Sequence, residues 1–253
     1  MLRSFRLWYR DSASKKLLWP QPSLAQQHLL NFIAGPLCVT LPTPQMTNWI
    51  KKFKFKKYRK ILLNAFPKGL HNDVNVVLDI LPFSENDVKL CDGKTHKVKD
   101  LIHDSNQQVI LDGEILKIPY RLYFNEPNIE EENQLTDNQK TILNCILLRH
   151  HNGYLRQNRL EQLHDKNDYW TTPFKIQLLG EYVIEILMVL NSQLDNKSIA
   201  NYRKFITENP TYWRLTESRM ISYWDAYYRR PKFPKLNTYI GRQIVDKIKK
   251  ANA

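Results

Sequence analysis

The sequence predicts a mainly helical protein of α+β class, in which a small N-terminal α/β part with a β-hairpin precedes a compact multi-helix domain. Two observations carry this prediction. Apolar residues recur at helical spacing through most of 135–253, whereas 107–124 alternates apolar and polar side chains, as a strand does. At 253 residues, the chain is long enough for one large domain or two small ones with a real core.

The first 45 residues differ from the rest of the chain. They are basic and contain several prolines, and no helical or strand period runs through them. We expect 1–45 to be an extension that is disordered or lies upstream of the native start, with Met46 as that start. The alternative is a targeting peptide, because Arg3, Arg6 and Arg10 stand among few acids, as in a mitochondrial presequence.

A basic and aromatic segment follows at 46–70, with eight Lys/Arg and no acid, a charge of +8. Because the whole chain carries +13 and 1–45 carry +4, only +1 remains for 71–253. Such a segment contacts anionic membranes or nucleic acid in some proteins; we favour a first helix with a basic solvent face. The residues considered for anion contact, including a second basic run near the C-terminus, are Lys51, Lys52, Lys54, Lys56, Lys57, Arg59, Arg229 and Arg230.

Residues 46–125 are expected to form the small α/β domain. A short helix is predicted over Asp73–Leu81, because Asn72 or Asp73 can cap it. The Asp92-Gly93 pair predicts a turn between two short strands.

The strongest strand signal lies at 107–124. Asp112-Gly113 is a hairpin turn sequence between Val109–Leu111 and Glu114–Phe124. Pro119 cannot donate to a ladder, so we expect an edge strand or a two-stranded ribbon.

Beyond the hairpin, the acidic and polar segment 126–134 is predicted to be a linker and a domain boundary, and 135–253 a helical domain. Thr136 and Gln139 have the spacing of a capping box. Apolar periodicity predicts helices over 136–151, 154–164, 172–190, 197–208, 211–229 and 236–250.

The helix expected over 172–190 is apolar around most of its circumference, which predicts that it is buried and that other helices surround it. Lys175, Glu181 and Glu185 interrupt it, which argues against a membrane span. Gln177, Glu181 and Glu185 are spaced four apart, so they should form one narrow polar stripe.

The segment 135–163 resembles two families. A capped helix, a turn with Gly153 and a second helix rich in Leu and Arg are similar to the opening of a winged helix-turn-helix protein. That resemblance implies that the next helix reads DNA, but the next helix is apolar with Lys175 as its only cation, which argues against DNA reading. Gly153 followed by Arg156 also resembles a HEAT-type repeat, which implies a HEAT-like stack of helix pairs.

If the chain is an enzyme, its catalytic residues are expected among Glu181, Glu185 and His150. The sequence lacks the HExxH, GxSxG and paired Cys/His motifs, so we predict no metal and no cofactor. We favour ion pairs for the two glutamates, because buried carboxylates need cationic partners. The arginines considered as partners are Arg149, Arg156, Arg159 and Arg219.

Aromatic residues cover about half the circumference of the helix expected over 211–229. We interpret them as core or as an interface, with a pocket wall as the alternative. The residues singled out are Trp213, Glu217, Trp224 and Tyr228. Glu217 lies inside the aromatic arc, so it should bond a Tyr hydroxyl or a Trp N–H, or face a pocket.

Three functional hypotheses follow. The preferred one is a non-enzymatic helical interaction module that binds a protein partner and exposes an apolar or aromatic patch. The second is nucleic-acid or anionic-surface binding through 49–60 and 229–250, which requires these two basic runs to meet in space. The third is an enzyme that uses Glu181 or Glu185 in a closed pocket, with a raised carboxylate pKa.

The three cysteines have no metal or disulfide spacing, and their odd number suits a reducing compartment. We therefore expect a soluble cytoplasmic protein without a transmembrane segment.

Overall fold

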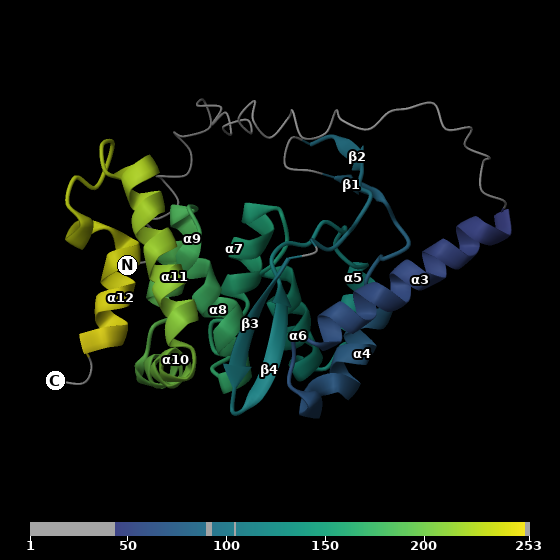
Figure 1. Ribbon diagram of the computed structural model, residues 1–253, viewed down its shortest axis with the longest axis horizontal. Helices are drawn as coiled ribbons and strands as arrows, with labels where there is room; N and C mark the ends of the chain where they lie inside the picture. The colour runs from purple at the N-terminus through teal and green to yellow at the C-terminus, as the bar shows by residue number, and fades with distance from the viewer. Residues whose placement is uncertain (1–43, 90–92, 104, 251–253) are drawn as a thin grey trace. The chain divides into compact units, whose positions relative to one another are not determined.

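The computed structural model describes residues 44–89, 93–103 and 105–250, and side chains from residue 54 onward. Within Pro44–Ala253, which form one compact unit, helices dominate and two small antiparallel hairpins accompany them (Figure 1). The predicted mainly helical class is confirmed. The expectations for residues 1–43 and for the side chains of Lys51 and Lys52 lie outside the described part.

The N-terminal helices pack against each other and against the helical part of the unit. They are α3 (Pro44–Leu63), the 3₁₀ turn η2 (Lys68–Leu70) and α4 (His71–Asp79), which confirms the helix predicted over Asp73–Leu81 within two residues. Phe66, just after α3, stacks on Phe174 with ring centroids 4.9 Å apart. Apolar burial therefore joins the two halves of the sequence.

Two hairpins supply the strands. The first pairs β1 (Asp87–Lys89) with β2 (Thr95–Lys97), and the second pairs β3 (Asn106–Leu111) with β4 (Glu114–Pro119). Both predicted hairpins are confirmed.

The turn between β3 and β4 is made by Asp112 and Gly113, which both have positive φ, 50° and 83°. Two such residues match the right-handed twist of the flanking strands. The strand expected to reach Phe124 ends at Pro119 instead. Beyond it, the Leu122 N–H donates to Arg149 O at 2.9 Å, so this segment leaves the hairpin for the helical part.

The segment predicted as an acidic linker contains the short helix α5 (Ile129–Asn133). Two of its acids are bound by the helical part, because Arg159 forms ion pairs with Glu126 and Glu132. The domain division at 126–134 stays a prediction.

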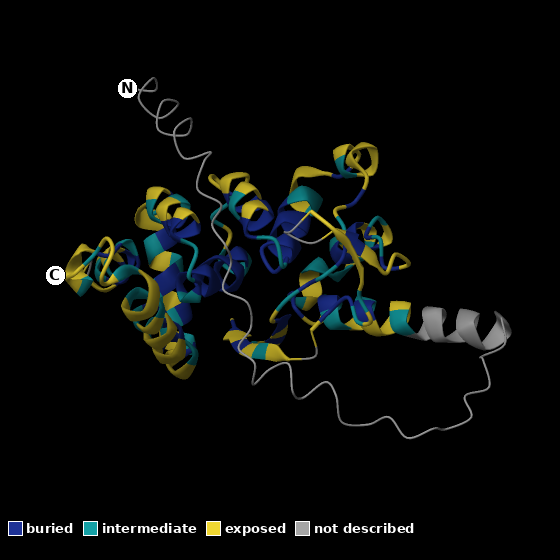
Figure 2. Cartoon of the chain, turned by 90° about the horizontal axis from the view of Figure 1, so that it is seen from above, coloured by how far each residue is buried: buried dark blue, intermediate teal, exposed yellow. Residues whose placement is uncertain are grey.

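The remaining helices follow in chain order, and the capping box of Thr136 and Gln139 at the first of them is confirmed. Buried residues gather along their inner faces (Figure 2). They are α6 (Asp137–Leu147), α7 (Gly153–Glu161), η3 (Tyr169–Thr171), α8 (Thr172–Ile176), η4 (Gln177–Gly180), α9 (Ile184–Ser192), α10 (Asn196–Glu208), α11 (Pro210–Tyr223), the π-helical turn η5 (Trp224–Tyr228), η6 (Leu236–Thr238) and α12 (Ile240–Lys250).

The single helix predicted over 172–190 is wrong. Its predicted burial is confirmed for 172–179 but not for Glu185 and Met188, which are exposed. The segment forms α8 and η4, leaves the helical path at Glu181, where φ is −109° and ψ is 158°, and resumes as α9. Residues 172–179 are all buried. The break follows Gly180, whose helix propensity is poor, and it lets the Glu181 carboxylate reach cations that a continuous helix would not offer. No helix among the described residues is long and apolar enough to cross a membrane.

Candidate functional site

Three arginines surround Glu181. Arg156 Nη2 lies 2.8 Å from Glu181 Oε2, Arg121 Nη2 lies 3.2 Å from Oε1, and Arg149 Nη2 lies 3.7 Å from Oε1. The prediction that this glutamate pairs with arginines is confirmed for Arg149 and Arg156. Arg121 was not anticipated, because nothing in the sequence shows that the end of the hairpin returns to the helical part.

This arginine–glutamate cluster, made of Arg121, Arg149, Arg156 and Glu181, holds its carboxylate ionised. Burial alone would raise the pKa of Glu181, but the nearby charges of Arg156, Arg121 and Arg149 outweigh burial and lower that pKa. Burial lowers the pKa of Arg149 to about 10, still above neutrality. The cluster therefore carries three positive charges against one negative charge, and its carboxylate is a poor proton carrier.

The polar stripe expected from Gln177, Glu181 and Glu185 does not form. The break after Gly180 separates them: Gln177 is buried in η4, whereas Glu185 is exposed on α9. Neither glutamate lines either of the two cavities described below. The lowered pKa of Glu181 is also opposite to the raised carboxylate pKa that the enzyme hypothesis requires.

His150 lies at the end of α6 with both ring nitrogens engaged. Nε2 is 2.7 Å from the Phe124 carbonyl oxygen, and Nδ1 accepts from the Asn152 N–H at 3.1 Å. This pattern requires the neutral tautomer with the proton on Nε2. Burial, with a contribution from the neighbouring His151, lowers the pKa of His150 to about 3. His150 is thus held neutral by its surroundings and has no free nitrogen for a substrate proton.

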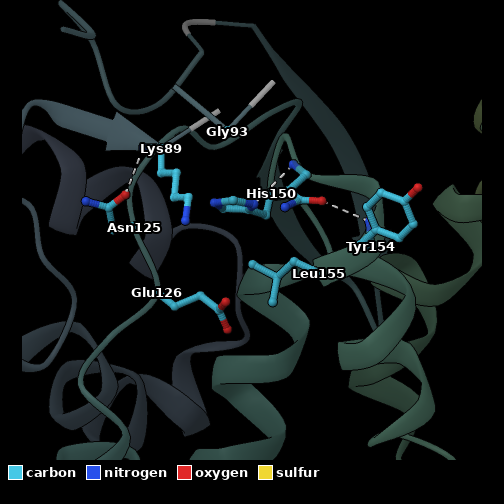
Figure 3. A pocket seen from close by; sticks show the side chains of 8 residues that line it. Lys89, Gly93, Asn125, Glu126, His150, Tyr154 and Leu155 are labelled. Carbon is cyan, nitrogen blue, oxygen red and sulfur yellow. Dashed lines mark hydrogen bonds between the residues drawn. The ribbon is translucent and has the colours of Figure 1, made fainter. Parts of the chain in front are cut away.

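A polar cavity of about 420 Å³ opens beside His150 (Figure 3). Lys89 and Glu126 face it, but Glu126 is already paired with Arg159. Within the described ranges, no group of three or more His, Cys, Asp or Glu side chains has the arrangement of a metal site.

The basic residues considered for anion contact are spread over the unit. Lys54 pairs with Asp100 at 3.3 Å, Arg59 with Asp79, and Arg229 with Asp225 at 2.8 Å. Lys56, Lys57 and Arg230 are exposed. The helix α3 and the C-terminal η5 and α12 lie at opposite ends of the unit in Figures 1 and 2. The two basic runs therefore do not meet there.

The aromatic residues singled out on α11 and η5 hold the C-terminal helices together. Trp213 is buried, the Trp224 Nε1–H donates to Phe233 O at 2.8 Å, and the Tyr228 hydroxyl donates to Tyr182 O. The partners expected for Glu217 are wrong, because its carboxylate pairs with Lys249 at 2.8 Å and Arg242 at 3.7 Å on α12. Both cations lie on α12, which packs against α11.

A second cavity, of about 450 Å³, lies between β3 and α11. We call it the β3–α11 groove. Its lining combines polar and apolar side chains, and Ile110 and Leu215 are 42% and 55% exposed. Its lining includes Gln108, Ile110, Tyr212, Leu215, Thr216 and Arg219.

At one end of the groove, the side-chain amide of Asn209 bonds the main chain of Ile110, as a neighbouring strand would. The Ile110 N–H donates to Asn209 Oδ1 at 2.7 Å, and Asn209 Nδ2 donates to the Ile110 carbonyl at 2.7 Å. These bonds show that the main-chain groups of Ile110 point away from β4 and toward the groove. Asn209 thus occupies the place that one residue of a third strand would take.

The rest of the β3 edge is open. Outward-facing residues alternate along an antiparallel strand, so Gln108 presents its N–H and C=O in the same direction as Ile110. Lys117 of β4 is its register partner. The main chain of Lys117 faces the other edge of the hairpin, where its N–H donates to Asn64 O at 2.8 Å. Among the described residues, nothing bonds the main chain of Gln108 at the groove.

The groove could not be predicted from the sequence. Pro119 indicated that the hairpin has an unpaired edge, which is the only signal that the sequence offered. It could not indicate that α11 lies alongside, because that placement depends on tertiary packing. Comparisons add no relative: no protein-family model matches this chain, and no curated protein or solved structure is significantly similar to it.

Proposed function

We propose that this chain is a non-enzymatic interaction module that binds an extended segment of a protein partner in the β3–α11 groove. The observation that carries the proposal is the open main chain of Gln108 beside a cavity with exposed apolar side chains. An unpaired strand edge can pair with another chain through its backbone, and pockets beside it can select the side chains of that chain. Leu215 and Ile110 offer apolar contacts for such side chains.

Other features agree with binding by an ordered surface. The groove is formed by a strand and a helix, and Asn209 fixes β3 against the α10–α11 junction through two hydrogen bonds. A rigid groove loses little conformational entropy when it binds. A helical-repeat arrangement and a cytoplasmic location remain part of the proposal; the latter is based on the odd number of cysteines.

Nucleic-acid or anionic-surface binding is the less favoured alternative. Convergence of the two basic runs would have supported it, but they lie at opposite ends of the unit. Several of the cations involved already hold intramolecular carboxylates, such as Lys54 with Asp100. An enzyme acting through Glu181, Glu185 or His150 is less favoured still, since neither of the two cavities formed by the described residues brings them together.

The test is selection of a random linear peptide library on the full-length chain, followed by measurement of the recovered peptides by fluorescence anisotropy. Two variants at position 108 separate the contribution of the main-chain N–H from that of the side chain. Gln108→Pro removes the outward N–H without breaking a hydrogen bond to β4, because proline is tolerated at an unpaired edge. Gln108→Val keeps that N–H and suits a strand.

We expect recovered peptides to bind wild type and Gln108→Val with similar affinity and to lose most of their affinity for Gln108→Pro. Circular dichroism should show that both variants keep the helical content of the wild type. The proposal is overturned if no peptide is enriched, or if enriched peptides bind the proline variant as well as the wild type.

A further inference from the structure

The groove is chemically asymmetric. The end near Asn209 is closed, and its one carboxylate, Glu208, is occupied: its Oε2 accepts from the Tyr169 hydroxyl at 2.8 Å and from the Asp112 N–H at 3.2 Å. Further along α11, the exposed Arg219 faces the groove. Within the described part of the chain, Arg219 has no hydrogen bond or ion pair.

The interior behind this part of α11 is positive as well. Tyr212 and Thr216 line the groove. Burial raises the pKa of the Tyr212 hydroxyl to about 12, and the nearby positive charge of Arg149, in the arginine–glutamate cluster, opposes that rise. That cluster has an excess of two positive charges, which Glu181 alone cannot balance. A partly enclosed site lined by one sign of charge concentrates the opposite sign.

We infer that the segment bound in the β3–α11 groove carries an acidic side chain that forms an ion pair with Arg219. This inference rests on the proposed function, and it names the chemistry of the partner. Pairing with Gln108 supplies main-chain hydrogen bonds that any sequence can make, so sequence selection must come from side chains along the groove. A free guanidinium group binds a carboxylate through two parallel hydrogen bonds, which selects an acid at one position of the segment.

The experiment uses the peptides recovered on the full-length chain as probes. Each is compared with a version in which one Asp or Glu becomes Asn or Gln. The variants are Arg219→Gln and, as the matched control, Arg214→Gln. Arg214 is an exposed arginine on the same helix outside the groove lining, so both variants remove one charge from α11.

We expect an acid at one fixed position of the recovered peptides. Neutralising it, or making Arg219→Gln, should weaken binding about fivefold, with no further loss when both changes are combined. Arg214→Gln should change affinity less than about twofold. Selection on Arg219→Glu should enrich Lys or Arg at the position where the wild type enriches acids.

The inference is overturned if recovered peptides show no preferred acid, or if Arg219→Gln and Arg214→Gln have equal effects. Either result would leave the proposed function intact as long as binding stays sensitive to Gln108→Pro. Conversely, if no peptide is recovered at all, the proposed function itself fails.

Discussion

At the scale of single residues, His150 illustrates how burial decides chemistry. Its ring donates to Phe124 O and accepts from the Asn152 N–H, so protonation would break one of these bonds and place a charge in the interior. These two hydrogen bonds leave neither ring nitrogen free for a substrate proton, and they also make the stability of the fold sensitive to pH. Through its hydrogen bond to Phe124 O, the neutral imidazole connects the segment after α6 to the segment after β4.

We predict that His150 makes stability fall on acidification. In the unfolded chain it binds a proton below its ordinary pKa of about 6.5, whereas burial lowers the folded pKa to about 3. Between these values the unfolded state binds more protons, so the free energy of unfolding should drop by about 1.4 kcal/mol per pH unit as pH falls. Urea unfolding on both sides of pH 6.5 measures this slope.

His150→Gln should reduce that slope, while His164→Gln serves as the control. His164 is exposed, with 62% of its side chain accessible, so this variant removes a histidine without disturbing the interior. An equal slope in wild type and His150→Gln would contradict the assigned role of His150.

At the scale of elements, the edge of β3 is partly sealed by Asn209. We predict that Asn209→Ala costs about 1 to 3 kcal/mol of stability, because the Ile110 N–H and C=O both lose their partner. Hydrogen exchange of the Ile110 amide should accelerate, whereas that of Val109, which faces β4, should change little. Site-resolved exchange by NMR tests this, and an unchanged Ile110 rate would refute the sealing role.

Local chemistry made several elements predictable. Asp112-Gly113 specifies a turn with two positive φ values, and the capping box at Thr136 specifies a helix start. The break inside 172–190 could not be predicted, since its apolar pattern fits one helix or two. Gly180 is only a weak signal, because glycine is tolerated inside helices, and the ion pairs of Glu181 with Arg121, Arg149 and Arg156 form only in the folded chain.

The same distinction applies to the candidate site: one of its features follows from the sequence, and others depend on tertiary packing. Ion pairing of Glu181 followed from the cost of burying a carboxylate, which the sequence alone made clear. The β3–α11 groove required knowledge of which helix lies beside the hairpin. Gln108 and Arg219 are ordinary polar residues in the sequence. They become informative only in the structure, where, among the described residues, the main chain of Gln108 has no partner at the groove and Arg219 has no anion.

At the scale of the whole unit, the arginine–glutamate cluster joins distant parts of the chain. Arg121 follows the hairpin, Arg149 and Arg156 belong to the helical part, and Glu181 lies between α8 and α9. The cluster thus connects residues before and after the segment 126–134, which was predicted to be a linker. Loss of its carboxylate should therefore affect both sides.

We predict that Glu181→Gln lowers the free energy of unfolding by about 3 to 5 kcal/mol, because the buried guanidinium groups of Arg149 and Arg156 and the half-buried one of Arg121 would lose their counter-ion. Glu185→Gln is the matched control: this glutamate is exposed on α9, and its loss should cost less than about 0.5 kcal/mol. Urea unfolding, followed by tryptophan fluorescence and by circular dichroism, gives both values. A small effect of Glu181→Gln would show that the arginines are balanced in another way.

The amide of Asn209 has a further consequence, for the timing of association. By occupying the place of one strand residue, it leaves an incoming chain only a short run of backbone to pair with, and a short ladder holds few hydrogen bonds. Differences in affinity between related complexes lie mostly in dissociation rates. We therefore expect the proposed complex to dissociate quickly. A short open edge is also a poor template for pairing between two copies of the chain.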